Sequence, residues 1–148
     1  MKIEHDIEVD CRPAVLWNYL DDPEKMKLWL KGLVEVDRDG PRGVGSTATL
    51  RIKEGERIAE YQSRVIQREP PTHLTVDLTG RSLGDRAMLV EYLLTDLGGT
   101  TRLDYLCTCE FGPGGWFISL LAGLFGKAQV KGFLKTLKRL AEAEAGTA

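Results

Sequence analysis

Apolar and polar residues alternate one by one along the first segment of the chain, residues 2–9. Successive side chains of a β-strand point to opposite faces of a sheet, so a period of two predicts a strand with one buried face. We therefore expect the chain to begin with such a strand. The positions expected to face inward are Ile3, His5, Ile7 and Val9.

In the next segment apolar residues recur every three or four positions, which predicts a helix over residues 12–20. Asp10 is placed to cap this helix, and Pro13 falls in its first turn, where a missing N–H costs little. Residues 21–24 close the helix and begin a second short helix that ends near Gly32. Two short helices are thus expected after the first strand.

Most of the middle of the chain has the pattern of strands joined by turns. Clusters of glycine, proline and polar residues at 39–43, 54–55 and 97–100 separate the apolar runs, as turns do. Strands grouped together, with helices before and after them, predict an α+β domain with a curved antiparallel sheet of about seven strands. The six strands expected here are residues 33–38, 46–53, 56–68, 74–79, 86–96 and 101–111.

The last part of the chain predicts a long helix whose apolar face changes side. At 100° per residue, one side of its first half carries Phe117, Ile118, Leu120, Leu121, Leu124, Phe125 and Ala128. Nearly the opposite side of its second half carries Val130, Phe133, Leu134, Leu137, Leu140 and Ala141. Either the helix bends near Gly123 and Gly126, or its first half is buried nearly all round. Residues 116–125 then either pack in the core or roof a cavity.

Length and composition fit one folded domain over residues 1–148, since 43% of the residues are hydrophobic and 28% are charged. The net charge of −2 provides no basic surface, so we do not expect a nucleic-acid partner. The first residues lack the apolar core of a signal peptide, and the apolar stretch 116–125 is about half as long as a membrane span. Three cysteines without scaffold-like spacing suit a reducing compartment. These features predict a cytoplasmic protein.

Side chains expected on the inner face of the sheet are mostly apolar with a few polar tips, which is typical of a small-molecule pocket. They are His5, Ile7, Leu50, Tyr61, Leu74, Val76, Met88, Val90, Tyr92, Leu103, Tyr105 and Cys107. From the last helix, Phe117, Leu120, Leu121 and Leu124 are expected to join them. The same residues would also fill a solid core. The three tyrosines favour a cavity, because each buried hydroxyl needs a partner.

Few residues offer catalytic or metal chemistry. His5 is the one imidazole expected on the inner face, where it is a candidate general base, although such histidines are more often hydrogen-bonded core residues. Cys107 and Cys109 share one face of a strand, but a structural zinc site needs four ligands in two close pairs. We therefore expect no metal and no cofactor.

Several stretches together resemble the START-like (SRPBCC, helix-grip) superfamily, in its polyketide cyclase and lipid transport branch. These are residues 7–24, Trp29 followed by residues 32–34, the Gly-Val-Gly-Ser run at 43–46 and the end of the last helix at 137–142. The resemblance covers essentially the whole chain. It implies a seven-stranded sheet wrapped around the last helix, and a deep cavity used across the superfamily for lipids, sterols, polyketides and plant hormones. It does not imply one reaction.

Three functions remain open at this point. The first is binding or transport of a hydrophobic or amphipathic small molecule, lipid- or polyketide-like, by a monomer or a homodimer. The second is a polyketide cyclase or dehydratase that uses the same cavity, with His5 or a tyrosine moving a proton. The third is a peripheral membrane or partner-binding module, because the basic run 127–139 follows the apolar segment 116–125.

Overall fold

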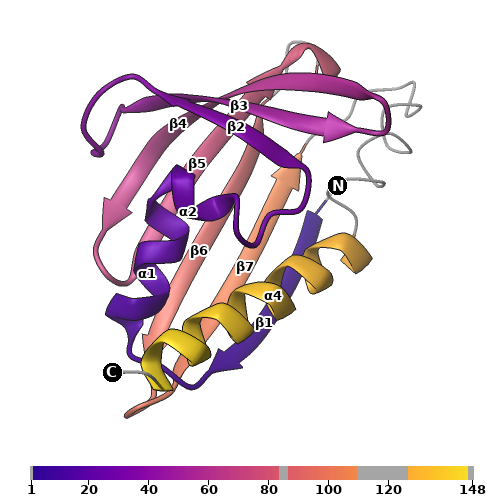
Figure 1. Cartoon of the computed structure of the whole chain (residues 1–148). Coiled ribbons are helices and arrows are strands. Elements are labelled where there is room, and N and C mark those ends of the chain that lie inside the picture. Colours follow the sequence, from indigo (N-terminus) through magenta and orange to yellow (C-terminus); the bar gives the residue numbers. More distant parts are fainter. Residues whose placement is uncertain (1, 84–86, 110–126, 147–148) are drawn as a thin grey trace.

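The computed structural model describes residues 2–83, 87–109 and 127–146, and these form one sheet with helices on a single face (Figure 1). The expected contributions of Phe117, Leu120, Leu121 and Leu124, and the expected bend near Gly123 and Gly126, lie outside the described residues. The elements are β1 (Lys2–Val9), α1 (Pro13–Asp21), α2 (Pro23–Met26), β2 (Leu33–Arg38), β3 (Thr47–Glu54), β4 (Arg57–Glu69), β5 (His73–Gly80), η1 (Arg81–Leu83), β6 (Met88–Asp96), β7 (Thr101–Cys109) and α4 (Lys127–Gly146).

The seven strands form one antiparallel sheet in the order β1-β7-β6-β5-β4-β3-β2. Each strand from β2 to β7 pairs with its neighbour along the chain, and β1 pairs with β7 in a register that sets His5 opposite Tyr105. In Figure 1 the sheet curves so that β2 and β3 bend over the face that carries the helices. The predicted α+β class with a curved antiparallel sheet is therefore confirmed.

Helix α1 begins where the sequence predicts, but its cap is not the expected one. Pro13 occupies the first turn, and the N-cap residue is Arg12, whose side chain makes no capping hydrogen bond. The prediction that Asp10 caps the helix is wrong: its carboxylate instead accepts a hydrogen bond from the Thr100 hydroxyl at 3.1 Å. Asp10 belongs to the turn after β1, where the β6–β7 hairpin lies close enough to compete for its side chain.

Helix α4 packs its second-half apolar face against β1 and α1. Of the residues expected on that face, Phe133 and Leu140 are partly buried, and the others are fully buried: Val130, Leu134, Leu137 and Ala141. Two polar contacts hold the end of the helix to the end of β1. Lys138 donates from Nζ to the Glu8 carbonyl at 2.6 Å, and the Asp10 N–H donates to Glu142 Oε2 at 2.8 Å. The long C-terminal helix of the prediction is thus present over the part described.

None of the helices within the described residues is both long and apolar enough to cross a lipid bilayer.

Candidate functional site

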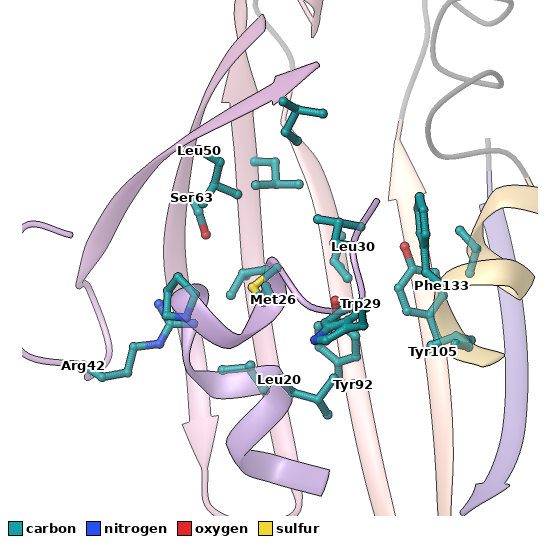
Figure 2. Close-up of a pocket in the computed structure, with 18 residues that line it drawn as sticks. Leu20, Met26, Trp29, Leu30, Arg42, Leu50, Ser63, Tyr92, Tyr105 and Phe133 are labelled. Atoms are coloured by element: carbon teal, nitrogen blue, oxygen red, sulfur yellow. The ribbon is translucent and has the colours of Figure 1, made fainter. Parts of the chain in front are cut away.

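A cavity lies between the inner face of the sheet and the helices (Figure 2). About 710 Å³ between its walls is free of protein atoms, including solvent at its mouth, and the centre of a water molecule can explore about 40 Å³ of it. It is therefore a narrow cavity rather than a solid core. The described lining residues are Leu20, Pro23, Met26, Trp29, Leu30, Arg42, Leu50, Ile52, Ser63, Leu74, Val76, Leu78, Val90, Tyr92, Tyr105, Val130, Phe133 and Leu134.

Strand alternation explains why most of this wall is apolar. Every second residue of β3 and β5 is buried on the inner face of the sheet. Leu50 and Ile52 of β3 and Leu74 and Val76 of β5 therefore all contribute to the cavity wall. On the other side of the cavity, the apolar face of α4 contributes Phe133 and its neighbours. A wall of this kind excludes water from all but a few polar positions.

The structure brings six of the residues predicted from the sequence into the cavity wall. They are Leu50, Leu74, Val76, Val90, Tyr92 and Tyr105. Four others are buried but do not line it: Tyr61, Met88, Leu103 and Cys107. The Tyr61 hydroxyl donates a hydrogen bond to Glu54 Oε1.

The structure places His5 and Ile7 outside the described cavity wall. His5 is only partly buried, and its Nδ1 accepts a hydrogen bond from the Asp6 N–H at 3.1 Å. It borders a more open hollow shared with acidic residues such as Glu4 and Asp104. Ile7 is a partly buried neighbour of the core. His5 therefore does not belong to the described wall of this cavity.

Sequence reasoning missed the part of the wall that comes from α1, α2 and the turn after them. Met26, Trp29 and Leu30 line the cavity there, and Trp29 donates from Nε1 to the Tyr19 carbonyl at 2.9 Å. The spacing of these apolar residues in the sequence indicates that they are buried. It does not indicate whether they contact other core side chains or line a cavity. Ser63 had a clearer signal, because it alternates with the buried Tyr61 on the inner face of β4.

Two hydroxyl groups in the wall have no hydrogen-bond partner among the described residues. Ser63 is buried at 7% exposure, and Tyr92 is buried at 5%. No fully enclosed side-chain nitrogen or oxygen of the described residues lacks a partner, so both hydroxyls retain contact with free space. They are the polar points to which a guest in the cavity can hydrogen-bond.

The aromatic side of the cavity is packed edge to face. The ring centroids of Trp29 and Tyr92 are 6.5 Å apart, and those of Tyr92 and Tyr105 are 5.6 Å apart. Burial raises the pKa of Tyr92 strongly, with a further increase from Cys107. Burial also raises the pKa of Tyr105 well above its ordinary value. Both phenols are therefore neutral at pH 7 and act as hydrogen-bond donors rather than as bases.

A cluster of three charged residues meets the cavity at the end of α1. Arg68 binds Asp21 with two bonds, Nε to Oδ1 at 3.0 Å and Nη2 to Oδ2 at 2.8 Å. Arg42, from the β2–β3 loop, adds one bond from Nε to Oδ1 at 3.2 Å. Burial by itself raises the pKa of Asp21, but the hydrogen bonds and charges of the two arginines outweigh burial and lower it. Asp21 is thus an anion between two cations.

Metal-binding side chains do not gather in the part of the chain that the structure describes. Across residues 2–83, 87–109 and 127–146, no group of three or more His, Cys, Asp or Glu residues is arranged to hold a metal ion. Cys107 is a buried thiol, and burial raises its pKa to about 11. It is therefore protonated at neutral pH, which makes it a poor nucleophile and a poor metal ligand.

A curved antiparallel sheet that holds a C-terminal helix over an inner cavity is the helix-grip architecture of START-like proteins. The family model described as "Polyketide cyclase / dehydrase and lipid transport" matches residues 1–142, and the chain belongs to this family. No curated protein matches the sequence.

Several solved structures have the same fold. The aromatase/cyclase Zhui from Streptomyces sp. R1128 is 16% identical, with 97% of this chain and 94% of that chain covered and a TM-score of 0.77. A norcoclaurine synthase from Thalictrum is also 16% identical, with 97% and 95% covered and a TM-score of 0.73. The Aha1 dimer from Colwellia psychrerythraea is 16% identical, with 96% of each chain covered and a TM-score of 0.67. At such identities the likeness establishes the fold and not the activity.

Proposed function

We propose that this protein binds a hydrophobic or amphipathic small molecule in the cavity, as a carrier or sensor. The observation that carries the proposal is the wall itself: an apolar enclosure with one guanidinium and two hydroxyls that have no hydrogen-bond partner among the described residues. This is the composition expected of a site that obtains affinity from apolar contact and orientation from a few polar groups.

Apolar burial is a sufficient source of affinity. Each Å² of apolar surface removed from water contributes about 25 cal/mol, so a guest that buries about 300 Å² gains roughly 7 kcal/mol before the cost of association. No catalytic group is needed for this gain. The described lining residues include no histidine, cysteine or carboxylate, so they supply no general base.

The family also contains cyclases, and one observation supports that second function. The hydroxyls of Ser63 and Tyr92, which no other described residue engages, are able to donate hydrogen bonds to carbonyl oxygens of a reactive chain folded inside the cavity. Tyr92→Phe separates the two functions. A carrier retains its affinity for an apolar guest after this change, whereas a cyclase of this kind loses turnover while still binding.

Binding itself is tested by narrowing the cavity from the sheet. Val90 on β6 lines the cavity, whereas Leu93, three residues further along the same strand, is 45% exposed. We expect Val90→Phe to weaken binding of the fluorescent probe N-phenyl-1-naphthylamine by about tenfold or more, because a phenyl ring occupies the guest's space. Fluorescence titration measures the dissociation constant.

Leu93→Phe is the matched control, since it adds the same ring to the same strand outside the cavity. Its affinity for the probe should stay within about twofold of the original protein. Circular dichroism of both variants checks that the sheet is intact. Equal affinities of a folded Val90→Phe variant and the original protein would show that the probe binds elsewhere, and the proposal would then be wrong.

A further inference from the structure

The charged cluster at the cavity contains one more cation than it has anions. Arg68 already contacts both oxygens of Asp21 in the two-bond arrangement that suits a guanidinium and a carboxylate. Arg42 reaches the same carboxylate only through its Nε, at 3.2 Å. Asp21 is thus fully paired without Arg42, and the cluster of these three residues retains a net charge of +1.

The surplus guanidinium belongs to the cavity wall. The Arg42 side chain is 11% exposed and lines the cavity, whereas Arg68 does not. Figure 2 shows Arg42 extending from the β2–β3 loop toward the helix that carries Met26. Its two terminal nitrogens have no hydrogen-bond partner among the described residues, and Asp21 is its only ion-pair partner there.

An arrangement of this kind is costly without a ligand. Burial lowers the pKa of Arg42, yet a guanidinium remains protonated in proteins, so the charge persists. Buried charges are normally paired, and a guanidinium fork fits a carboxylate through two parallel N–H donors. The described residues provide no second carboxylate to Arg42. The missing anion is therefore one that a guest can supply.

We propose that the cavity selects hydrophobic carboxylic acids in their ionised form, and that Arg42 is the residue that recognises the carboxylate. This inference rests on the proposed function and adds the chemical class of the guest. The terminal nitrogens of Arg42 bind the carboxylate, and the apolar body lies against Leu50, Leu74 and Val90. Ser63 provides a further hydroxyl on the inner face of β4, which Figure 2 shows turned into the cavity.

A comparison of decanoate with decan-1-ol isolates the head group, because the two molecules share one alkyl chain. Each is titrated against the protein loaded with N-phenyl-1-naphthylamine, and displacement gives its dissociation constant. We expect decanoate to bind at least about tenfold more tightly than decanol, since charge-assisted hydrogen bonds replace neutral ones. In Arg42→Gln the two affinities should come within about twofold, with decanol nearly unchanged.

Arg64→Gln is the matched control. Arg64 carries the same charge but is 57% exposed on β4, where it pairs with Asp77 at 3.4 Å. It should keep the full preference for decanoate. Arg42→Gln should remain folded because Asp21 keeps both bonds to Arg68. A second measurement needs no variant: ¹³C NMR of carboxyl-labelled decanoate bound to the original protein should give a carboxyl pKa below that of free decanoate.

The outcomes separate this inference from the proposed function. Tight but equal binding of decanoate and decanol, or a raised carboxyl pKa in the complex, overturns the selection of ionised acids and leaves small-molecule binding in place. If Arg64→Gln also loses the preference for decanoate over decanol, the preference comes from the overall charge of the protein, and the role of Arg42 is overturned. Failure of the original protein to bind N-phenyl-1-naphthylamine, decanoate and decanol contradicts both proposals.

Discussion

Asp21 accepts hydrogen bonds from two arginines that belong to different parts of the chain, the β2–β3 loop and the end of β4. Its pKa is lowered from the ordinary value of 3.8, so the folded protein binds a proton to this carboxylate less readily than the unfolded chain does. The resulting stabilisation is fully present above about pH 4–5 and is lost as the pH falls through the lowered pKa. The free energy of unfolding therefore decreases when acid protonates Asp21.

Replacing this carboxylate should reduce both stability and its dependence on acid pH. We expect Asp21→Asn to lower the free energy of unfolding at pH 7 by about 3 kcal/mol, because two partly buried guanidiniums lose their anion. Between about pH 4 and pH 2 the variant should lose less stability than the original protein. Urea denaturation at several pH values measures both effects.

Asp104→Asn serves as the comparison, because Asp104 pairs with Arg102 where both side chains are more than a third exposed, at 38% and 47%. Such a surface pair contributes less than about 1 kcal/mol. If the stability of Asp21→Asn falls as steeply with decreasing pH as that of the original protein, protonation of Asp21 is not the cause of the acid sensitivity.

Arg42 and Ser63 show how far sequence reasoning reaches at the level of single residues. Ser63 was predictable from alternation, since its neighbours two positions away on β4 face inward. Arg42 was not, because it lies among glycine and proline residues of a turn, where a charged residue normally faces solvent. Its Nε donates a hydrogen bond to Asp21, which is close in space but 21 residues away in the sequence.

At the level of elements, the strands were the most predictable part because alternation is local to each strand. The predicted strands 33–38 and 46–53 correspond to β2 and β3 within about one residue at each end. The Asp10 cap failed for the opposite reason. Whether a side chain caps a helix depends on the other polar groups that the fold places near it. Here the Thr100 hydroxyl, from the β6–β7 hairpin, donates a hydrogen bond to the Asp10 carboxylate.

Close packing between β4 and β5 makes Gly80 the most constrained glycine in the sheet. An added Cβ would lie 2.9 Å from both the Glu60 carbonyl oxygen and Tyr61 Cδ1. We expect Gly80→Ala to lower the free energy of unfolding by about 1–3 kcal/mol, because the backbone and a buried ring must both move. Thermal and urea denaturation provide the measurement.

Gly132→Ala in α4 is the opposite case, since an added Cβ there meets no atom within 4 Å. It should stabilise the protein by about 0.5–1 kcal/mol, because alanine favours the helix interior. If both alanine variants change the free energy of unfolding in the same direction, crowding around an added Cβ does not explain the effect of Gly80→Ala.

At the level of the whole molecule, the cavity was the least predictable feature. Met88 and Val90 alternate on the same strand and both are buried, yet only Val90 is among the described cavity-lining residues. Whether facing side chains meet or leave space depends on how the curved sheet and the helices are spaced. No local pattern carries that information, and so the sequence left solid core and cavity as alternatives.

A guest held in the cavity should stabilise the whole molecule, because the unfolded chain has no such site. At a ligand concentration of about 100 times the dissociation constant, binding adds about 2.7 kcal/mol and should raise the Tm by about 5–10 °C. Differential scanning fluorimetry with decanoate measures the shift. The Val90→Phe variant should show little shift at the same concentration, and an equal shift in both proteins would contradict binding in this cavity.

The pairing of β1 with β7 also sets an order of events during synthesis. All other neighbours in the sheet are consecutive in the chain, so β2 to β7 are able to assemble hairpin by hairpin as they leave the ribosome. Strand β1 is made first, but its partner begins only at Thr101. Until β7 is made, the backbone hydrogen-bonding groups of β1 are able to pair with other nascent chains. The negative charges of Glu4, Asp6 and Glu8, on one face of β1, repel a second copy of the same strand during this interval.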